Sequence, residues 1–271
     1  MLNINADEMD NYLIKIGGST ITNIRKANTA KPAEIKRIFN EIKPYLHGRH
    51  IIVGHGSGSF AHIPAHKYKV NQGMINPNSV KGASITQDAA ARLHRIVLDC
   101  AVSSGVNPLS FAPSSGALSK NGKIAKWDLS PMKTALSLGF LPITYGDVVV
   151  DSEKGFSIAS TEEVFRHVSS IIKPKKIIIG TDVDGIFDSD PKLNNGAKLI
   201  KRIDKGNINE ILNYAGSSTK VDVTGGMKSK LKYLYNMSRE TGAACQIINI
   251  AVPGNLAKTL KGNSIGTKIK A

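Results

Sequence analysis

Short runs rich in β-branched residues alternate with longer helical patterns along almost the whole chain, and this alternation restricts the fold more than any other feature. The expected strands are residues 12–16, 50–54, 108–112, 141–145, 176–181 and 245–250. The expected helices lie near residues 32–46, 79–103, 130–138, 161–172 and 226–241. Parallel strands need crossover connections, which are usually helical. The pattern therefore predicts an α/β fold with a largely parallel sheet that helices cover on both faces.

Composition places the chain among ordinary globular proteins. Its 271 residues are 41% hydrophobic and 21% charged, which is enough to bury a sizeable core. The two cysteines, Cys100 and Cys245, belong to no CxxC pair, so no disulfide framework is expected. The first residues are polar and do not resemble a signal peptide, and no apolar run approaches the roughly 20 residues of a membrane helix. We expect a cytoplasmic protein with no membrane partner.

The formal charge of +15 raises the question of nucleic-acid binding. The lysines are scattered, aromatic residues are few, and no helix–groove, zinc-finger or stacking pattern accompanies them. We therefore expect a solvated basic surface and no nucleic-acid partner. A positive field would still attract small anionic substrates. The alternative, a nucleic-acid-binding protein, would bind DNA with an affinity that falls steeply as the salt concentration rises.

Two glycine turns follow expected strands in the N-terminal half. The first contains Gly17 and Gly18 after Lys15, and the second contains Gly56 and Gly58, with His62 a few residues later. Successive N–H groups of such turns can converge on a phosphate oxygen. The second turn also fits GxGxxG/A, but no acidic residue stands about 20 positions on to bind a ribose. A phosphate-binding loop is the better interpretation, and the alternative for each turn is a structural turn.

Two further turns follow in the C-terminal half. Asp182 and Asp184 close the strand 176–181, where carboxylates could orient a lysine, accept from a ribose hydroxyl or help to hold Mg²⁺. A Gly-Gly turn opens a helix at Gly226, close to Lys230, and a helix N-terminus favours anions. The alternatives are an Asp-Gly turn and a plain helix start. Together, the four turns indicate a site that gathers several phosphate groups.

Several other phosphate and metal chemistries are excluded by missing motifs. The chain has no GxxxxGK[ST] segment and no HRD/DFG set, so it is neither a P-loop enzyme nor a protein kinase. His62 and His66 have the spacing of HExxH but lack its glutamate, so no protein metal site is expected.

The segments KIGGS, HGSGSFAH, YGDVVVD, TDVDGIF and VDVTGGMKSKL span nearly the whole chain. In this order they resemble the amino-acid kinase superfamily, and most closely its isopentenyl phosphate kinase branch. The resemblance implies a three-layer αβα sandwich with a central, mainly parallel sheet. It implies a single domain over residues 1–271, with an acceptor-binding lobe of about 1–172 and an ATP-binding lobe of about 173–271. It further implies ATP and Mg²⁺, a small-molecule phosphate acceptor and a homodimer.

The resemblance also implies roles for individual residues. Catalytic roles fall on Lys15, His62 and Lys230. The acceptor would be bound by Ser57, Gly58, His62 and Thr161. ATP would be bound by Lys15, Gly17, Gly18, Ser19, Gly58, Asp182, Gly226 and Lys230. The acceptor phosphate is itself a competent nucleophile, so positioning and charge neutralisation would carry the reaction.

Three departures from the branch pattern surround the acceptor site. Ser57 and Ala61 replace glycines of the usual HGGGSFGH, and Ser57 could add a hydrogen bond or crowd the site. Glu162 replaces the first aspartate of SGDD, which holds the lysines in place. A second lysine usually follows the first turn, but Ile24 stands there, with Arg25 and Lys26 next as possible substitutes.

These departures leave the acceptor open to alternatives. A kinase for another phosphonate or phosphomonoester, similar to fosfomycin kinases, also fits the histidine after the glycine loop. A non-catalytic ATP-binding regulator fits the missing second lysine. A carboxylate kinase fits less well, because His62 suits a phosphate acceptor. The helix 79–103 could line an apolar pocket for an isoprenoid tail or simply pack into the core.

Overall fold

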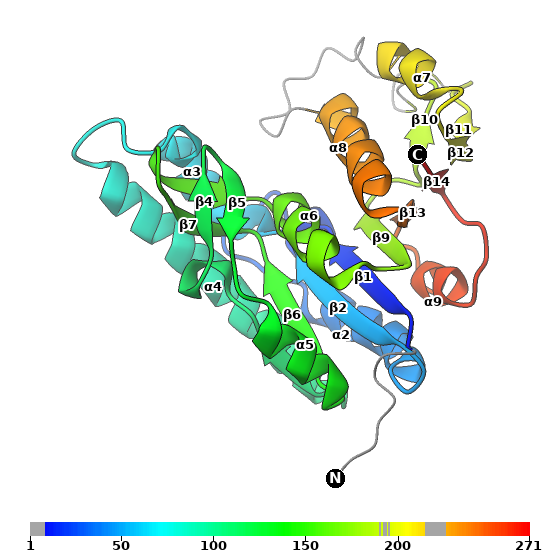
Figure 1. The fold of residues 1–271 in the computed structure, drawn as a ribbon, viewed down its shortest axis with the longest axis horizontal. Helices are drawn as coiled ribbons and strands as arrows, with labels where there is room; N and C mark the ends of the chain where they lie inside the picture. Colours follow the sequence, from blue (N-terminus) through cyan, green and yellow to red (C-terminus); the bar gives the residue numbers. More distant parts are fainter. Residues whose placement is uncertain (1–8, 190, 192–193, 195, 215–225) are drawn as a thin grey trace.

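The computed structural model describes residues 9–189, 191, 194, 196–214 and 226–271. Its centre is an eight-stranded sheet with the order β12-β14-β13-β9-β1-β2-β6-β3 (Figure 1). In chain order these strands are β1 (Asn11–Ile16), β2 (His50–His55), β3 (Pro108–Ser110), β6 (Leu141–Tyr145), β9 (Lys176–Thr181), β12 (Arg202–Ile203), β13 (Ala244–Asn249) and β14 (Thr267–Ile269). Neighbours are parallel except for the β13/β14 pair. The expected mainly parallel sheet is confirmed.

Helices cover both faces of this sheet. The α-helices are α1 (Gly18–Ile21), α2 (Pro32–Ile42), α3 (Gly58–Lys67), α4 (Ser79–Ser103), α5 (Ser130–Ser137), α6 (Thr161–Ile172), α7 (Ile208–Tyr214), α8 (Gly226–Thr241) and α9 (Asn255–Leu260). Short 3-10 turns occur at η2 (Lys43–Tyr45), η3 (Val70–Gln72) and η4 (Pro113–Ser115). No helix in the described ranges is long and apolar enough to cross a membrane.

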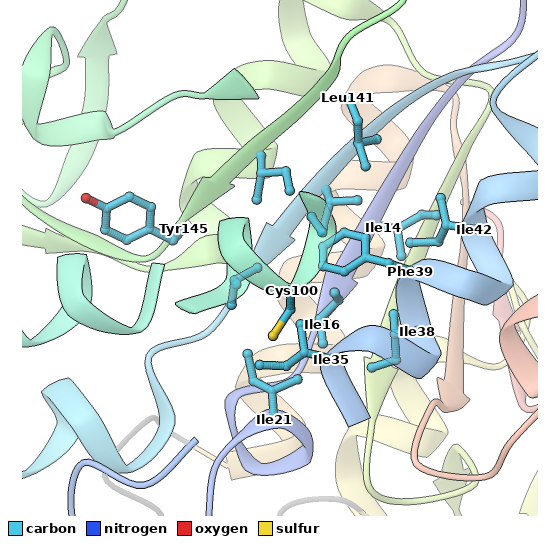
Figure 2. Close-up of a cluster of buried hydrophobic side chains, with 14 of the residues drawn as sticks. Ile14, Ile16, Ile21, Ile35, Ile38, Phe39, Ile42, Cys100, Leu141 and Tyr145 are labelled. Carbon is cyan, nitrogen blue, oxygen red and sulfur yellow. The ribbon is translucent and has the colours of Figure 1, made fainter. Parts of the chain in front are cut away.

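Alternating side chains of the central strands divide the core into two clusters. Ile14 and Ile16 of β1 pack with α2, α4 and α9 on one face (Figure 2). Leu13, the residue before Ile14, packs with α5, α6 and α8 on the other face. This period of two is what a strand buried on both faces produces. The arrangement is the expected three-layer αβα sandwich, which is confirmed.

The apolar face of α4 belongs to this core. Leu93 and Val97 are fully buried in the same cluster as the β1 isoleucines. These two side chains therefore pack in the core, and the lining of a pocket for an isoprenoid tail by this helix stays a prediction.

Two small sheets complete the fold. One pairs β10 (Ile186–Phe187) with β11 (Leu199–Ile200). The other has the order β5-β4-β7-β8, from β4 (Leu118–Lys120), β5 (Lys123–Lys126), β7 (Asp147–Asp151) and β8 (Gly155–Ala159). A separate small core of Val70, Ala83, Val148 and Phe156 attaches the second sheet to α4 and η3.

Observed and expected bounds differ by small amounts. Three helices, α4, α6 and α8, have the expected bounds, whereas the first helix stops at Ile42 and continues as η2 around Pro44. Proline interrupts the helical hydrogen bonds at that point. The strand expected at 108–112 ends at Ser110, and β13 is shifted by one residue. Shifts of one or two residues at an element's end are usual.

Candidate active site

The glycine turns that follow β1 and β2 are in direct backbone contact. A Cβ atom on Gly18 would lie 2.4 Å from the amide nitrogen and 2.7 Å from the Cα of Gly58. A Cβ atom on Gly17 would lie 2.9 Å from the carbonyl oxygen of Gly180, near the end of β9. Glycine therefore allows three strand ends to meet. They meet at the carboxyl edge of the parallel sheet, where open α/β folds bind ligands.

Thr22, directly after α1, joins the two turns through its hydroxyl group. The hydroxyl donates to the carbonyl oxygen of Gly18 at 2.7 Å and accepts from the N–H of Ser59 at 3.1 Å. Gly58, next to Ser59, has φ +48°, in the left-handed region that favours glycine. The sequence did not reveal Thr22, because a single threonine after a short helix carries no motif of its own.

The loop after β2 presents backbone N–H groups at the start of α3. Within the described ranges, the N–H groups of Ser57 and Gly58 have no protein acceptor. The first N–H groups of a helix lack intrahelical partners and favour a bound anion. His62 lies one turn further along α3, with an exposed side chain. A phosphate bound at these N–H groups would thus lie about one helical turn from His62.

Lys15 of β1 forms an ion pair with Glu162 of α6. The Nζ atom of Lys15 lies 2.6 Å from Oε1 of Glu162, and the side chains are only 11% and 17% exposed. Partial burial reduces solvent screening, so this pair fixes Lys15 more firmly than an exposed pair would. An ammonium group has three N–H donors, and the contact with Glu162 leaves capacity for a phosphate oxygen. Glu162 stands at the position of the first aspartate of SGDD, and its carboxylate contacts Lys15 although its side chain is one methylene longer.

Ser57 and Thr161 use their hydroxyl groups on the protein itself. Ser57 Oγ donates to the carbonyl oxygen of Gly146 at 3.1 Å, and Thr161 Oγ1 donates to the carbonyl oxygen of His55 at 2.8 Å. Thr161 is also buried. Both hydroxyls therefore hold the loops after β2 and β6 in place.

The second glutamate of α6, Glu163, connects this helix to β5 and α8. Its carboxylate accepts from the Tyr233 hydroxyl and the Ile124 N–H, each at 2.7 Å, and pairs with Arg166 at 2.7 Å. Burial and the Glu163 charge raise the pKa of Tyr233, so its hydroxyl stays protonated and donates. Because Tyr233 lies on α8, which also carries Lys230, the network ties that helix to α6.

The expected nucleotide-side residues lie after β9 and on α8. Asp182 is exposed at the end of β9. Gly226 and Lys230 are in the first part of α8, but the surroundings of Gly226 and the side chain of Lys230 are not among the described features. Residues 215–225, which include Asp222, also lie outside the described residues. Their contacts to ATP stay predictions.

The candidates for the missing second lysine lie on the surface. Arg25 and Lys26 are exposed in the segment between α1 and α2, and Ile24 beside them is 71% exposed. The N–H of Arg25 donates to the Asn23 side chain at 3.0 Å, which shapes the turn. A role of Arg25 or Lys26 in place of the second lysine stays a prediction.

A series of hydrogen-bonded side chains, mostly buried, contacts the loop after β2. His55, the last residue of β2, is fully buried, and its Nε2 atom lies 3.0 Å from Nδ1 of His94 on α4. Nε2 of His94 lies 2.8 Å from Oγ of Ser110, and Nδ1 of His55 lies 3.2 Å from the carbonyl oxygen of Gly56. Tyr145 stacks on His94 with 4.2 Å between ring centroids. Its hydroxyl points away from the isoleucine cluster in Figure 2.

The charge states of this series follow from burial. Burial lowers the pKa of His55 to about 4 and, with the neighbouring His55 and Arg95 charges, lowers the pKa of His94 to about 2. Burial and the nearby Asp147 raise the pKa of Tyr145, and burial raises the pKa of Asp147 against its hydrogen bonds. Both imidazoles are therefore neutral at neutral pH.

These lowered pKa values predict that acid destabilises the fold through the histidine pair. Below about pH 6.5 the unfolded chain binds protons that folded His55 and His94 do not bind, so the stability they contribute falls with pH. For His55 alone, the free energy of unfolding should drop by roughly 2 kcal/mol between about pH 7 and about pH 5. Denaturant unfolding across this range measures the slope. A His94→Asn variant should show a shallower slope than wild type, and equal slopes in the two proteins would contradict the prediction.

Comparison with known proteins gives the family. The model of the amino acid kinase family matches residues 12–249. The chain belongs to the amino acid kinase family. Within it, the chain is 34% identical over 268 residues to the isopentenyl phosphate kinase of Methanothermobacter thermautotrophicus, covering 95% of this chain and 98% of that one. It is likewise 34% identical to the isopentenyl phosphate kinase of Methanocaldococcus jannaschii, covering 95% and 97%.

Solved structures of the family agree with this similarity. A crystallographic structure of isopentenyl phosphate kinase superposes with a TM-score of 0.82 at 30% identity, covering 96% of this chain and all of that one. The UMP kinase of Bacillus anthracis superposes with a TM-score of 0.66 at 17% identity, which shows the shared amino acid kinase fold alone. The resemblance based on the five sequence segments is confirmed.

Proposed function

We propose that this protein transfers the γ-phosphoryl group of ATP to isopentenyl phosphate, giving isopentenyl diphosphate and ADP. The observation that carries the proposal is the convergence of two glycine turns beside Lys15. It occurs in a chain that is 34% identical to an isopentenyl phosphate kinase over nearly its full length. The family accounts for ATP as the co-substrate.

The reaction needs positioning more than acid–base chemistry. An oxygen of the acceptor phosphate attacks the γ-phosphorus, and the bond from that phosphorus to the β–γ bridging oxygen breaks. ADP leaves with the electron pair of this bond. A phosphate monoester dianion carries no proton that must be removed, so no general base is required.

Different residues are proposed to bind the acceptor, to neutralise the transferred group and to bind ATP. His62 and the N–H groups of Ser57 and Gly58 hold the acceptor phosphate, while Thr161 fixes their loop. Lys15, held by Glu162, neutralises charge on the transferred group. The proposed ATP contacts are those of Gly17, Gly18, Ser19, Gly58, Asp182, Gly226 and Lys230.

Mg²⁺ is proposed to arrive with ATP. No three His, Cys, Asp or Glu side chains gather into a metal site in the part of the chain that the structure describes. Mg²⁺ usually keeps several waters and is bound through substrate phosphates with one or two carboxylates. Asp182 is the candidate carboxylate, and the bound ion would supply neutralisation of phosphate charge.

The larger organisation is proposed in the same way. Residues of about 1–172 form the acceptor-binding lobe and about 173–271 the ATP-binding lobe of one domain. The homodimer and the cytoplasmic location stay predictions.

A coupled ADP-release assay tests the function directly. Mg²⁺–ATP is offered with isopentenyl phosphate, dimethylallyl phosphate, fosfomycin and acetylglutamate. We expect turnover to concentrate on isopentenyl phosphate. Preferred turnover of fosfomycin would favour the phosphonate kinase, and ATP binding without product from any acceptor would favour the regulator. Either result would reject the proposal.

A further inference from the structure

We propose that the buried His94–His55 pair positions the acceptor loop by holding the carbonyl group of Gly56, so that the N–H of Ser57 faces the acceptor phosphate. The pair itself touches neither substrate, so both histidines are positioning residues. The proposal rests on the proposed function, because it assigns the acceptor phosphate to this loop.

The hydrogen bonds of the pair have one consistent direction. The Gly56 carbonyl oxygen can only accept, so Nδ1 of His55 carries the hydrogen of their 3.2 Å contact. Because His55 is neutral, its Nε2 is bare and accepts from Nδ1–H of His94 at 3.0 Å. Nε2 of neutral His94 then accepts from the Ser110 hydroxyl at 2.8 Å. Every ring nitrogen of the two histidines therefore has a hydrogen-bond partner. The last donor of the series, Nδ1–H of His55, donates to the Gly56 carbonyl oxygen in the loop.

The geometry of the peptide group carries this direction to the surface. No cis peptide bond occurs in the described residues, so the Gly56–Ser57 unit is trans, with its C=O and N–H pointing in opposite directions. The carbonyl of Gly56 is directed at the buried His55 ring. The N–H of Ser57 must therefore point away from that ring, and within the described ranges it has no protein acceptor.

Other contacts fix the rings themselves. Tyr145 stacks on His94 at 4.2 Å and on His55 at 5.6 Å between centroids. Thr161 donates to the carbonyl oxygen of His55, which fixes the backbone just before the loop.

The Gly56 N–H donates to the Ile16 carbonyl oxygen at 3.0 Å, and the Ser57 hydroxyl donates to the Gly146 carbonyl oxygen at 3.1 Å. The contact with His55 adds a hold on the Gly56 carbonyl group, and through it on the orientation of the Gly56–Ser57 peptide group.

Steady-state kinetics of variants at His94 tests the proposal. His94→Leu removes the donor to His55, and we expect a roughly tenfold rise in the KM for isopentenyl phosphate with the KM for ATP within about twofold of wild type. His94→Asn keeps an N–H near the position of Nδ1 and should recover part of this loss. His167→Leu is the matched control, because it removes another buried histidine, on α6, whose Nε2 lies 3.2 Å from the Trp127 carbonyl oxygen.

The outcomes separate the inference from the proposed function. If wild type does not phosphorylate isopentenyl phosphate, the proposed function fails and the inference with it. If wild type is active but His94→Leu keeps its acceptor KM, or changes the two KM values in the same ratio as His167→Leu, the inference alone is overturned. If His94→Leu does not fold, Ser110→Ala provides the test, because it removes only the hydroxyl group of this exposed residue, at the outer end of this series of hydrogen bonds. A twofold to threefold rise in acceptor KM alone is expected there, and an unchanged value rejects the inference.

Discussion

Replacing Lys15 by methionine is expected to lower kcat by roughly 10²–10³, because it removes a preorganised cation from the transferred phosphoryl group. Methionine keeps much of the side-chain length and apolar stem of lysine, so packing beside β1 should survive. The ammonium group alone would be lost. Single-turnover measurement with saturating ATP and isopentenyl phosphate isolates the transfer step from substrate binding.

Because Lys15 is paired with Glu162, Lys15→Met should lower the stability of the fold as well as the activity. Lys15→Met removes the ammonium group that lies 2.6 Å from the Glu162 carboxylate, which is 17% exposed. Loss of this ion pair at a mostly buried carboxylate should cost about 1–3 kcal/mol of stability, so the midpoint of thermal unfolding should fall by several degrees. A loss of activity could then be ascribed to a weakened fold.

A double variant separates the two effects. Lys15→Met with Glu162→Gln removes both charges, so the thermal midpoint should return toward wild type. Activity should stay as low as in the single variant, because the catalytic cation is still missing. If activity returns together with stability, Lys15 serves the fold and not the reaction.

The elements of the sheet were predictable because their signals are local. β2 is buried along its whole length, and residues 51–53 at its centre form an apolar run with a glycine turn behind it. The helix α6 shows Ser160 as an N-cap that accepts from the N–H of Glu163, which fixes its start. The glycine turns were predictable for the same reason, since they follow directly on these strands.

The parts that were missed have weak or contradictory local signals. Residues 58–67 form α3, although Pro64 stands inside it and removes a backbone donor. The strands β4 and β5 are three and four residues long, with Gly122 in the turn between them. Strands this short carry too few residues for alternation to be counted.

The polar contacts of the site were missed for a different reason. His55 and His94 are 39 residues apart in the sequence, and their contact depends on how α4 crosses the end of β2. Thr22 meets Ser59 across 37 residues, through the approach of two turns. Glu162 was expected opposite the lysines only because of the family resemblance; neither spacing nor composition relates it to Lys15, 147 residues earlier. Long-range polar pairs follow from the assembled fold and have no period to detect.

The approach of the two glycine turns gives the second large expected effect. Gly18→Ala should lower kcat/KM by at least about 10², because the new methyl group would lie 2.4 Å from the nitrogen and 2.7 Å from the Cα of Gly58. Both atoms belong to the backbone, so no side-chain rotation relieves the clash. The turns must separate by about 1 Å, and a displacement of that size in a positioning site is enough for such a loss. Overpacking of this kind should also cost about 1–3 kcal/mol of stability.

Gly48→Ala supplies the control for this effect. It is the same chemical change at an exposed turn before β2, where a Cβ atom would meet no atom within 4 Å. We expect its stability to stay within about 0.5 kcal/mol of wild type and its activity to be unchanged. Denaturant unfolding and the ADP-release assay measure both quantities. Full activity in Gly18→Ala would mean that the two turns need not touch during transfer, and the phosphate site would then have to be sought away from their junction. Lost activity with nearly intact stability would instead place the spacing of the two turns directly in the transfer step.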